Sequence, residues 1–503
     1  MRTQQFFDHH GVASNPFAEE DAQTDRVFKS RCVEVRHPAW DKVFGDPADP
    51  ATSLVFGEKG AGKTAMRLQI ADAIEKHNHA STTGQGGESR LWVIEYDDFN
   101  PLLDRFADRL PARKQRDPSR VLAEWKLWDH MDCVLSLAVT DLVDHVLGAE
   151  TPRGPTANVL HAGDARAKLD RSQKRDLLVL AACYDDSHTE PPVERWQRLR
   201  RALRFTSWAG WKWAAIGVLV TIVVAGLLYW SKDAAWLSGP WPYLAVAAGW
   251  LPWIYKWCDR QILAAAIRRR VRVIRRDATA LRRQLMGLTH ADLANQPMPV
   301  HRRTDDRYEL FAKLQGVLRT LGSTGVVVLV DRIDEPHLTG GRVEHMRDFV
   351  WSMLDNKFLK QPGVGVKLLL PAELHEHLAR EDRDFHQRAR LDKQNVIPSL
   401  DWTGEALLDL ANARLAACAA EGRTPQLRDL IDPAVSDARV LDALRSLRTP
   451  RHMFKFLFRM LTTHCTGHTD GDPSYRVSPE TFEAVLAVYS REQASVDRGL
   501  GLA

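Results

Sequence analysis

The feature that most constrains this chain is the segment GEKGAGKT, residues 57–64. An apolar run, SLVF, precedes it, and the amphipathic pattern AMRLQIADAIEKH follows it. Its three glycines let the backbone curl so that several N–H groups converge on one point, and a helix that begins there adds its positive end. The segment therefore predicts a strand–loop–helix unit that binds phosphate groups.

Every fixed position of the phosphate-loop pattern G-x-x-x-x-G-K-[ST] is present in this segment. An ammonium at Lys63 is suited to the β- and γ-phosphates of a nucleotide, and the hydroxyl of Thr64 is suited to Mg²⁺. We see no clear N-K-x-D motif for reading guanine, which weakly favours ATP over GTP. The predicted nucleotide-binding residues are Gly57, Glu58, Lys59, Gly60, Ala61, Gly62, Lys63 and Thr64.

A second acidic motif follows an apolar run, in VVVLVDRIDE at 326–335. A buried strand here would deliver Asp331 to its carboxyl end, where ligands bind in open α/β sheets. We expect Asp331 to hold Mg²⁺ together with Thr64, directly or through water. Either Glu335 or Asp334 could orient the attacking water, and Glu335 is the first choice.

Two more short apolar runs read as buried strands, LWVIEY at 91–96 and VGVKLLL at 364–370. Helical patterns lie between the strands, and the chain reads as helical from Leu400 onward. Strands that alternate with helices predict an α/β fold with a mostly parallel sheet.

A long uncharged run, WAAIGVLVTIVVAGLLYWS, lies between Lys212 and Lys232. At ~1.5 Å per residue such a helix would span roughly 28 Å, close to the thickness of a bilayer core. A second uncharged run lies between Asp233 and Lys256, although its prolines limit regular helix. Together the two runs predict a transmembrane helical hairpin.

Arginines flank this hairpin on both sides, whereas its connecting loop carries only Lys232 and Asp233. By the positive-inside rule, both ends of the hairpin lie in the cytoplasm. The stretch RRRVRVIRR within an expected helix from Arg260 to Leu288 favours contact with anionic lipid over contact with nucleic acid. The flanking arginines are Arg195, Arg198, Arg200, Arg201, Arg204, Arg260, Arg268, Arg269, Arg270, Arg272, Arg275 and Arg276.

The net charge of +4 argues against a globally basic nucleic-acid binder. The six cysteines form no C-x-x-C pair, which indicates reduced thiols rather than a disulfide framework or a zinc site. The first residues, MRTQQFFDHHG, lack the apolar run of a cleavable signal peptide, so we expect insertion through the internal segment.

The order of these motifs resembles the KAP family of P-loop NTPases, which carry transmembrane helices inserted into the nucleotide domain. The segment RTPRHMFKFLF at 448–458 is similar to that family's C-terminal N-P-R motif. The resemblance implies that Arg451 begins a lid helix and reaches the γ-phosphate. Two departures stand out: Arg332 follows Asp331 where many members have a second Asp, and the 364–370 strand continues into Pro371 without a polar sensor residue.

The sequence thus predicts a membrane-anchored P-loop ATPase that uses ATP and Mg²⁺ and acts as a signalling or defence switch. It would lie in the inner (cytoplasmic) membrane as a multi-pass protein, with the lipid bilayer contacting 208–257 and both termini in the cytoplasm. Alternatives are a nucleotide-gated scaffold with little turnover and a DNA-associated ATPase, while a homo-oligomer or a protein partner stays open. The expected parts are a leader (1–45), a first P-loop part with a helical insert (46–205), the hairpin (206–258), an Arg-rich connecting helix (259–300), a second P-loop part (301–400) and a C-terminal helical lid domain (401–503).

Overall fold

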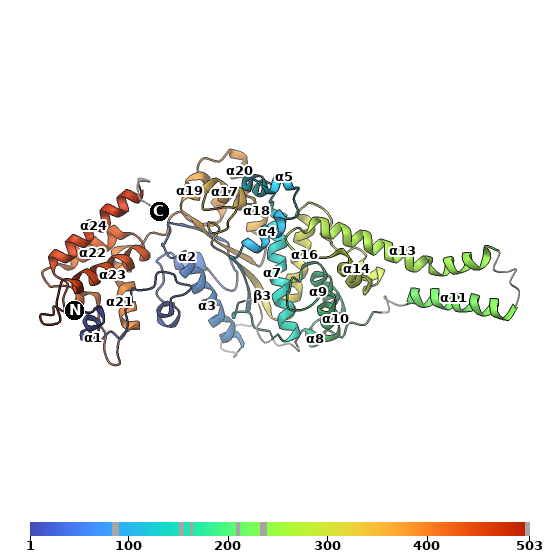
Figure 1. Ribbon diagram of the computed structural model, residues 1–503, viewed down its shortest axis with the longest axis horizontal. Coiled ribbons are helices and arrows are strands. Elements are labelled where there is room, and N and C mark those ends of the chain that lie inside the picture. The colour runs from blue at the N-terminus through green and yellow to red at the C-terminus, as the bar shows by residue number, and fades with distance from the viewer. Residues whose placement is uncertain (83–89, 150–154, 161–163, 208–211, 232–238, 498–503) are drawn as a thin grey trace. The chain divides into compact units, whose positions relative to one another are not determined.

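The computed structural model describes residues 1–82, 90–149, 155–160, 164–207, 212–231 and 239–497. Five parallel strands form one sheet in the order β2-β3-β4-β1-β5, and the rest of the regular structure in these residues is helical (Figure 1). The expected α/β class with a parallel sheet is therefore confirmed. The short edge strand β5, Asn395–Ile397, was not expected from the sequence.

The chain divides into two compact units that do not follow the boundaries expected from the sequence. Unit 1 comprises Met1–His77, Leu329–Glu335 and Leu354–Ala503, and unit 2 comprises Asn78–Val328 and Pro336–Met353. The leader and the C-terminal helices, which we expected as separate parts, both belong to unit 1 together with the glycine-rich loop. The elements that begin in unit 1 are α1 (Thr3–His9), η1 (Phe28–Cys32), α2 (Trp40–Phe44), β1 (Ser53–Gly57), α3 (Lys63–Thr82), α18 (Asn356–Leu359), β4 (Val364–Pro371), α19 (Glu373–Leu378), α20 (Arg383–Ala389), η3 (Leu391–Lys393), β5, α21 (Gly404–Ala417), η4 (Leu427–Leu430), α22 (Asp437–Leu447), α23 (Pro450–Thr466) and α24 (Pro479–Asp497).

In unit 1, β1 is the strand that carries the glycine-rich loop. All five of its residues are buried, and it pairs in parallel with β4 on one side and β5 on the other. Such a run of buried residues is typical of a central strand covered on both faces. The register sets Gly57 beside Pro371, so the loop after β1 begins level with the end of β4.

The leader contributes to the core of the helical part of unit 1. Phe6, Phe7 and Phe17 are fully or almost fully buried, and they share one apolar cluster with residues of α21, α22, α23 and α24. The leader is therefore a structural part of the C-terminal helical region, because burying three aromatic rings stabilises that cluster by several kcal/mol, at roughly 1.5–3 kcal/mol each.

Unit 2 is built mainly of helices and contains buried ion pairs. Arg307 pairs with Asp132 at 3.0 Å and Arg272 pairs with Asp129 at 2.8 Å, and all four side chains are almost fully buried. The elements that begin in unit 2 are β2 (Arg90–Tyr96), α4 (Asn100–Ala107), α5 (Ala112–Gln115), α6 (Pro118–Ala123), α7 (Leu127–Leu147), α8 (Asp164–Lys168), α9 (Arg171–Tyr184), α10 (Pro192–Ala202), α11 (Lys212–Ser231), α13 (Trp241–Arg270), α14 (Ala278–Met286), α15 (His290–Leu293), α16 (Asp305–Thr320), β3 (Ser323–Val330), α17 (Val343–Val350) and η2 (Trp351–Met353).

Two apolar helices of unit 2, α11 and α13, run side by side (Figure 1). Gly217 and Gly249 allow the close approach, because a β-carbon at position 217 would lie 2.7 Å from Trp250 and one at position 249 would lie 2.8 Å from Val220. The indole Nε1 of Trp250 also donates a hydrogen bond to Thr221 at 3.1 Å. Small residues at a helix contact are typical of membrane helix pairs.

Of the described helices, one is long and apolar enough to cross a membrane, with its span at Lys212–Trp230 in α11. The second expected span, between Asp233 and Lys256, does not meet the same criterion of length and apolar composition. The 30-residue helix α13, which contains most of it, is apolar in its first half and charged in its second. The connecting loop with Lys232 and Asp233 lies outside the described residues, as do residues 208–211 of the expected bilayer contact.

The expected Arg-rich helix over 259–300 is wrong. Helix α13 ends at Arg270, and α14 begins only at Ala278. The break has a structural reason, since Arg272 and Arg276 between the two helices are buried and bonded inside unit 2. These two arginines therefore belong to the packing of the unit and do not face lipid.

Candidate functional site

The loop between β1 and α3 has the curled backbone that the glycines predict. Gly60 and Gly62 adopt φ values of +91° and +96°, a region that side chains with a β-carbon rarely enter. Lys63 is the first residue of α3, and its ammonium donates to the backbone carbonyls of Gly57 at 2.7 Å and Glu58 at 3.0 Å. The lysine thus closes the loop on itself.

Burial lowers the pKa of Lys63, while the carboxylates of Asp334 and Asp331 oppose this effect. A buried ammonium is stable in its charged form only when anions or strong acceptors surround it. An anionic ligand at this loop would supply more of that compensation than two carbonyl oxygens do.

The hydroxyl of Thr64, at the start of α3, donates a hydrogen bond to the carboxylate of Asp331 at 2.9 Å. Asp331 follows the last residue of β3 and is 2 % exposed. Burial raises the pKa of Asp331, and the guanidinium of Arg67 at 3.5 Å opposes that shift. Two residues separated widely in sequence, a threonine and a carboxylate, therefore meet where the sequence predicted a shared metal ligand set.

Arg332, directly after Asp331, adopts a left-handed backbone conformation with φ +60°. Its Nε atom lies 3.5 Å from Oε1 of Glu335, and its guanidinium also bonds to Gln23 of the leader. Burial raises the pKa of Glu335, and the charge of Arg332 opposes that change. Glu335, the residue expected to orient water, is thus paired with Arg332.

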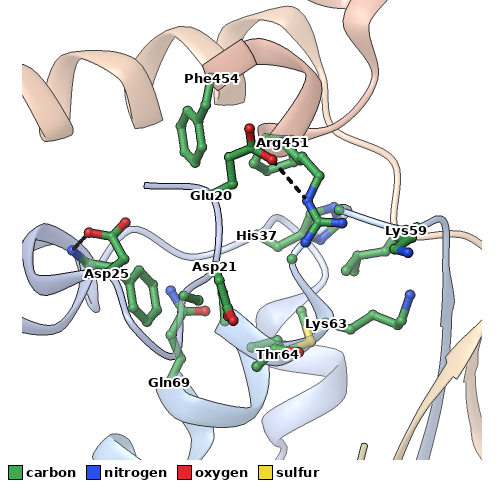
Figure 2. A pocket seen from close by; sticks show the side chains of 18 of the residues that line it. Glu20, Asp21, Asp25, His37, Lys59, Lys63, Thr64, Gln69, Arg451 and Phe454 are labelled. Atoms are coloured by element: carbon green, nitrogen blue, oxygen red, sulfur yellow. Dashed lines mark hydrogen bonds and ion pairs between the residues drawn. The ribbon is translucent and has the colours of Figure 1, made fainter. Parts of the chain in front are cut away.

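Arg451 lies at the beginning of α23 and packs directly on Gly60. The hydroxyl of Thr449 caps the helix by accepting from His452 N at 3.3 Å, and Pro450 follows as its first residue. The backbone N–H of Arg451 faces the carbonyl of Gly60 at 3.4 Å. The Nε atom of Arg451 has no hydrogen-bond acceptor among the described residues and lies 3.9 Å from Glu20 (Figure 2).

Most of the residues predicted from the sequence line one cavity of about 170 Å³. Gly57, Glu58 and Ala61 are not among its lining residues, although their carbonyls accept bonds from Lys63 and Trp402. The predicted residues that line it are Lys59, Gly60, Gly62, Lys63, Thr64, Asp331, Asp334, Glu335 and Arg451.

The leader also lines this cavity, which the sequence did not reveal. Glu20 and Asp21 add carboxylates close to the loop (Figure 2). Phe28 adds an apolar side chain to the lining. No pattern in this polar segment identifies it as part of a site, because its contacts connect residues hundreds of positions apart. The leader lining consists of Glu20, Asp21, Ala22, Asp25, Phe28, Val35 and His37.

Three further residues near the loop were missed. The indole of Trp402 donates to the carbonyl of Ala61 at 2.8 Å and so fixes the tip of the loop. Glu373, just after β4, contributes a negative charge near Lys63. Arg67 could have been found from the sequence, since it lies three residues after Thr64 and so shares its face of α3.

These features define an α/β protein with one polar site at the carboxyl ends of β1 and β3, built from a glycine-rich loop and a buried carboxylate. Comparisons with protein-family models, with curated proteins and with solved structures give no match.

Proposed function

We propose that the chain is a membrane-anchored P-loop ATPase that binds ATP with Mg²⁺ and acts as a switch at the cytoplasmic face of a membrane. The observation that carries the proposal is the 2.9 Å contact between the Thr64 hydroxyl and the Asp331 carboxylate. A hydroxyl and a carboxylate this close, beside a loop that presents backbone N–H groups, suit a magnesium ion bound to phosphate oxygens. The resemblance to the KAP family supports the same proposal.

The triphosphate would lie on the loop from Gly57 to Thr64. Gly60 and Gly62 have left-handed φ values, which allow a loop to curl so that N–H groups can meet a phosphate, and the beginning of α3 would add a positive electrostatic potential there. Lys63 would exchange the two loop carbonyls for phosphate oxygens, which form stronger, charge-assisted hydrogen bonds.

The residues present fit a magnesium ion. Asp331 is a buried carboxylate whose negative charge is incompletely balanced, as its raised pKa indicates, and the Thr64 oxygen lies next to it. When bound, Mg²⁺ would neutralise charge on the phosphates. Thr64 and Asp331 would hold it, directly or through water.

Hydrolysis would use the carboxylates and the arginine that lie near the γ-phosphate position. Water would attack the γ-phosphorus, the bond from that phosphorus to the bridging oxygen would break, and ADP would leave. Glu335 or Asp334 would accept the proton of the water, and the raised pKa of Glu335 suits a proton acceptor. Arg451 would stabilise charge on the phosphoryl oxygens and transmit the nucleotide state to α23.

Membrane anchoring rests on the surface of α11 and α13. In the described part of the chain, every exposed large apolar or aromatic side chain except Phe458 lies on these two helices. A patch of this kind is typical of a membrane or protein contact. We therefore propose that both helices insert as a hairpin in the inner membrane, with the nucleotide site in the cytoplasm.

A nucleotide-gated scaffold with little turnover is the second candidate, and two observations favour it. Glu335 is ion-paired with Arg332, which competes with any water for that carboxylate. The β4 strand also ends at Pro371 and Ala372 follows it, and neither residue carries a polar side chain to orient the γ-phosphate. This candidate predicts tight ATP binding with slow phosphate release.

Binding and turnover of ATP by the purified protein in detergent test the proposal. Lys63→Ala should weaken ATP binding by roughly 10- to 100-fold, because each lost charge-assisted hydrogen bond contributes about 1.5–3 kcal/mol. The matched control is Lys76→Ala, on the same helix but exposed and paired with Glu34. Unchanged ATP affinity in Lys63→Ala would remove the proposal, and binding without phosphate release would favour the scaffold.

Membrane fractionation tests the anchoring separately. The protein should stay in the membrane fraction through a high-salt wash, because apolar insertion does not depend on ionic strength. Release by salt, combined with salt-sensitive DNA binding in the absence of detergent, would favour a DNA-associated ATPase instead.

A further inference from the structure

A groove with a volume of about 1080 Å³ lies on unit 2, beside the end of α10 and α14. Four arginines line it, and no carboxylate does among the described residues. Its lining consists of Trp196, Gln197, Arg200, Arg201, Arg204, Phe205, Thr206, Ser207, Arg283 and Gly287. A positively charged groove without counter-charges attracts anions.

Hydrogen bonds between the described residues of the unit explain the presence of only one of the four arginines that line the groove. Arg200 donates to the carbonyls of Phe205 at 3.3 Å and Ser207 at 3.1 Å, and its place in the last turn of α10 suits the helix dipole. Arg201, Arg204 and Arg283, which we call the groove arginines, are exposed. Among the described residues they make no hydrogen bond or ion pair with another side chain, so folding does not explain them.

Neighbouring arginines of the same flanks behave differently. Arg195 lies between Asp144 at 2.8 Å and Asp185 at 2.9 Å, and Arg272 is paired with Asp129. The sequence could not separate these two groups, because both appear as arginines that flank the apolar runs. The structure places Arg195 and Arg272 in buried ion pairs, whereas Arg201 and Arg204 are exposed and line the groove.

The floor of the groove has a fixed shape. The Trp196 side chain is buried, and its indole donates to the carbonyl of Leu178 at 2.9 Å. Gly287 packs so closely on this ring that a β-carbon there would lie 2.9 Å from it. The groove arginines therefore lie near a closely packed, hydrogen-bonded Trp196 side chain.

The groove also lies next to the base of the apolar hairpin. Arg282 stacks over the Trp257 ring of α13 at 4.6 Å, and its neighbour Arg283 lines the groove. The ammonium of Lys256 donates to the carbonyl of Met286 at 3.3 Å, a second tie between α13 and α14 (Figure 1). Because α14 joins both features, a membrane around the hairpin would bring lipid headgroups to the groove.

We propose that the groove binds the phosphate headgroup of an anionic phospholipid in the leaflet around the cytoplasmic end of the hairpin. The proposal rests on the proposed membrane insertion. Guanidinium groups match phosphate oxygens in paired hydrogen bonds, and an anionic leaflet attracts basic groups at its surface. The proposed contact uses Arg201, Arg204 and Arg283, which lie outside the expected stretch 268–276.

Lipid retention by the full-length protein tests this. Protein in a neutral detergent is mixed with phosphatidylglycerol or phosphatidylcholine, and bound lipid is counted by native mass spectrometry. The test variant is Arg201→Gln/Arg204→Gln/Arg283→Gln. The control variant Arg113→Gln/Arg302→Gln/Arg319→Gln removes the same charge from exposed arginines of unit 2 that do not line the groove.

The wild type should retain phosphatidylglycerol at least tenfold better than phosphatidylcholine, since each arginine at an anionic surface contributes roughly fivefold in affinity. The test variant should lose this preference and the control variant should keep it. Inorganic phosphate at millimolar concentration should not displace the lipid; displacement would identify a free-phosphate site and overturn the proposal.

The proposal fails if the test variant retains phosphatidylglycerol as the wild type does, or if duplex DNA binds through the groove arginines instead. Its failure is distinguishable from failure of the proposed function. Lipid retention is measured without nucleotide, so Lys63→Ala should retain lipid normally, whereas loss of the protein from membranes in high salt would reject the anchoring itself.

Discussion

Arg451 packs so closely on Gly60 that a β-carbon at position 60 would lie 2.5 Å from the β-carbon of the arginine. The first turn of α23 therefore rests on the glycine-rich loop, and the backbone N–H of Arg451 faces the carbonyl of Gly60. If binding of a nucleotide changed the conformation of the loop, the position of α23 would change with it.

Gly60→Ala should abolish this contact and weaken ATP binding strongly. Alanine at φ +91° carries strain of about 1–2 kcal/mol, and the new methyl group also displaces Arg451. The matched control is Gly422→Ala, which has φ +76° but no atom within 4 Å of the new β-carbon. Both variants should lower the melting temperature, but only Gly60→Ala should lose ATP affinity by titration calorimetry.

Glu20→Gln should strengthen ATP binding. Glu20 lies 3.9 Å from Arg451 and 3.5 Å from Lys455. Its carboxylate would therefore compete with a phosphate group for these two cations. The cavity of about 170 Å³ is also below the roughly 300–1,000 Å³ typical of small-molecule sites, and Glu20 is one of the leader residues that line it.

We expect roughly fivefold tighter binding in Glu20→Gln, because a charge pair near 4 Å contributes about 1 kcal/mol in water. The control is Glu19→Gln, an exposed neighbour that does not line the cavity. Equal affinity in both variants would show that Glu20 does not compete with the phosphates.

Arg332→Asn should raise the rate of ATP hydrolysis if Glu335 accepts the proton of the water. The substitution removes the ion pair at 3.5 Å, and asparagine tolerates the left-handed backbone at this position. An ion pair that is partly exposed, as this one is, contributes about 0–1 kcal/mol, so we expect an increase in kcat of up to roughly fivefold. Combining the change with Glu335→Gln should abolish the gain, and persistence of the gain would point to Asp334.

The stability of unit 2 should depend on pH through His145 of α7. Burial by itself lowers the pKa of His145, but the carboxylate of Asp141 at 3.2 Å and the backbone hydrogen bonds raise it to about 9. Its two ring nitrogens face the carbonyls of Asp141 and Asn158, at 2.9 Å and 2.8 Å, so both donate when the ring is charged.

Because the folded pKa is above the ordinary 6.5, this stabilisation is complete below pH 6.5 and is lost as pH rises through about 9. The difference in melting temperature between wild type and His145→Gln should therefore shrink from pH 6 to pH 10. His130 on the same helix is the control, since burial lowers its pKa to about 3 and it stays neutral over this range. A His130→Gln difference should stay constant, and a constant His145→Gln difference would contradict the assignment.

Much of the fold and the site could be predicted from the sequence. The four strands beginning at Ser53, Arg90, Ser323 and Val364 were found because each is a short apolar run bounded by polar residues. The contact of Thr64 with Asp331 was anticipated because strands of a parallel sheet end on one edge. The sequence did not predict that Glu20 and Trp402 belong to the site. Neither residue is part of a local pattern, and both reach the loop through the packing of segments distant in sequence.

The sequence by itself determined what local backbone preferences and hydrophobic periodicity control: the curled loop at Gly60 and Gly62, the buried strands and the long apolar helix α11. The tertiary structure decided which residues meet across long separations. It set β4 between β1 and β3, brought the leader into the cavity, and divided the flanking arginines into buried partners such as Arg272 and exposed ones such as Arg204. The physical reason is that local conformation depends on neighbouring residues, whereas burial and charge pairing depend on the packing of the whole chain.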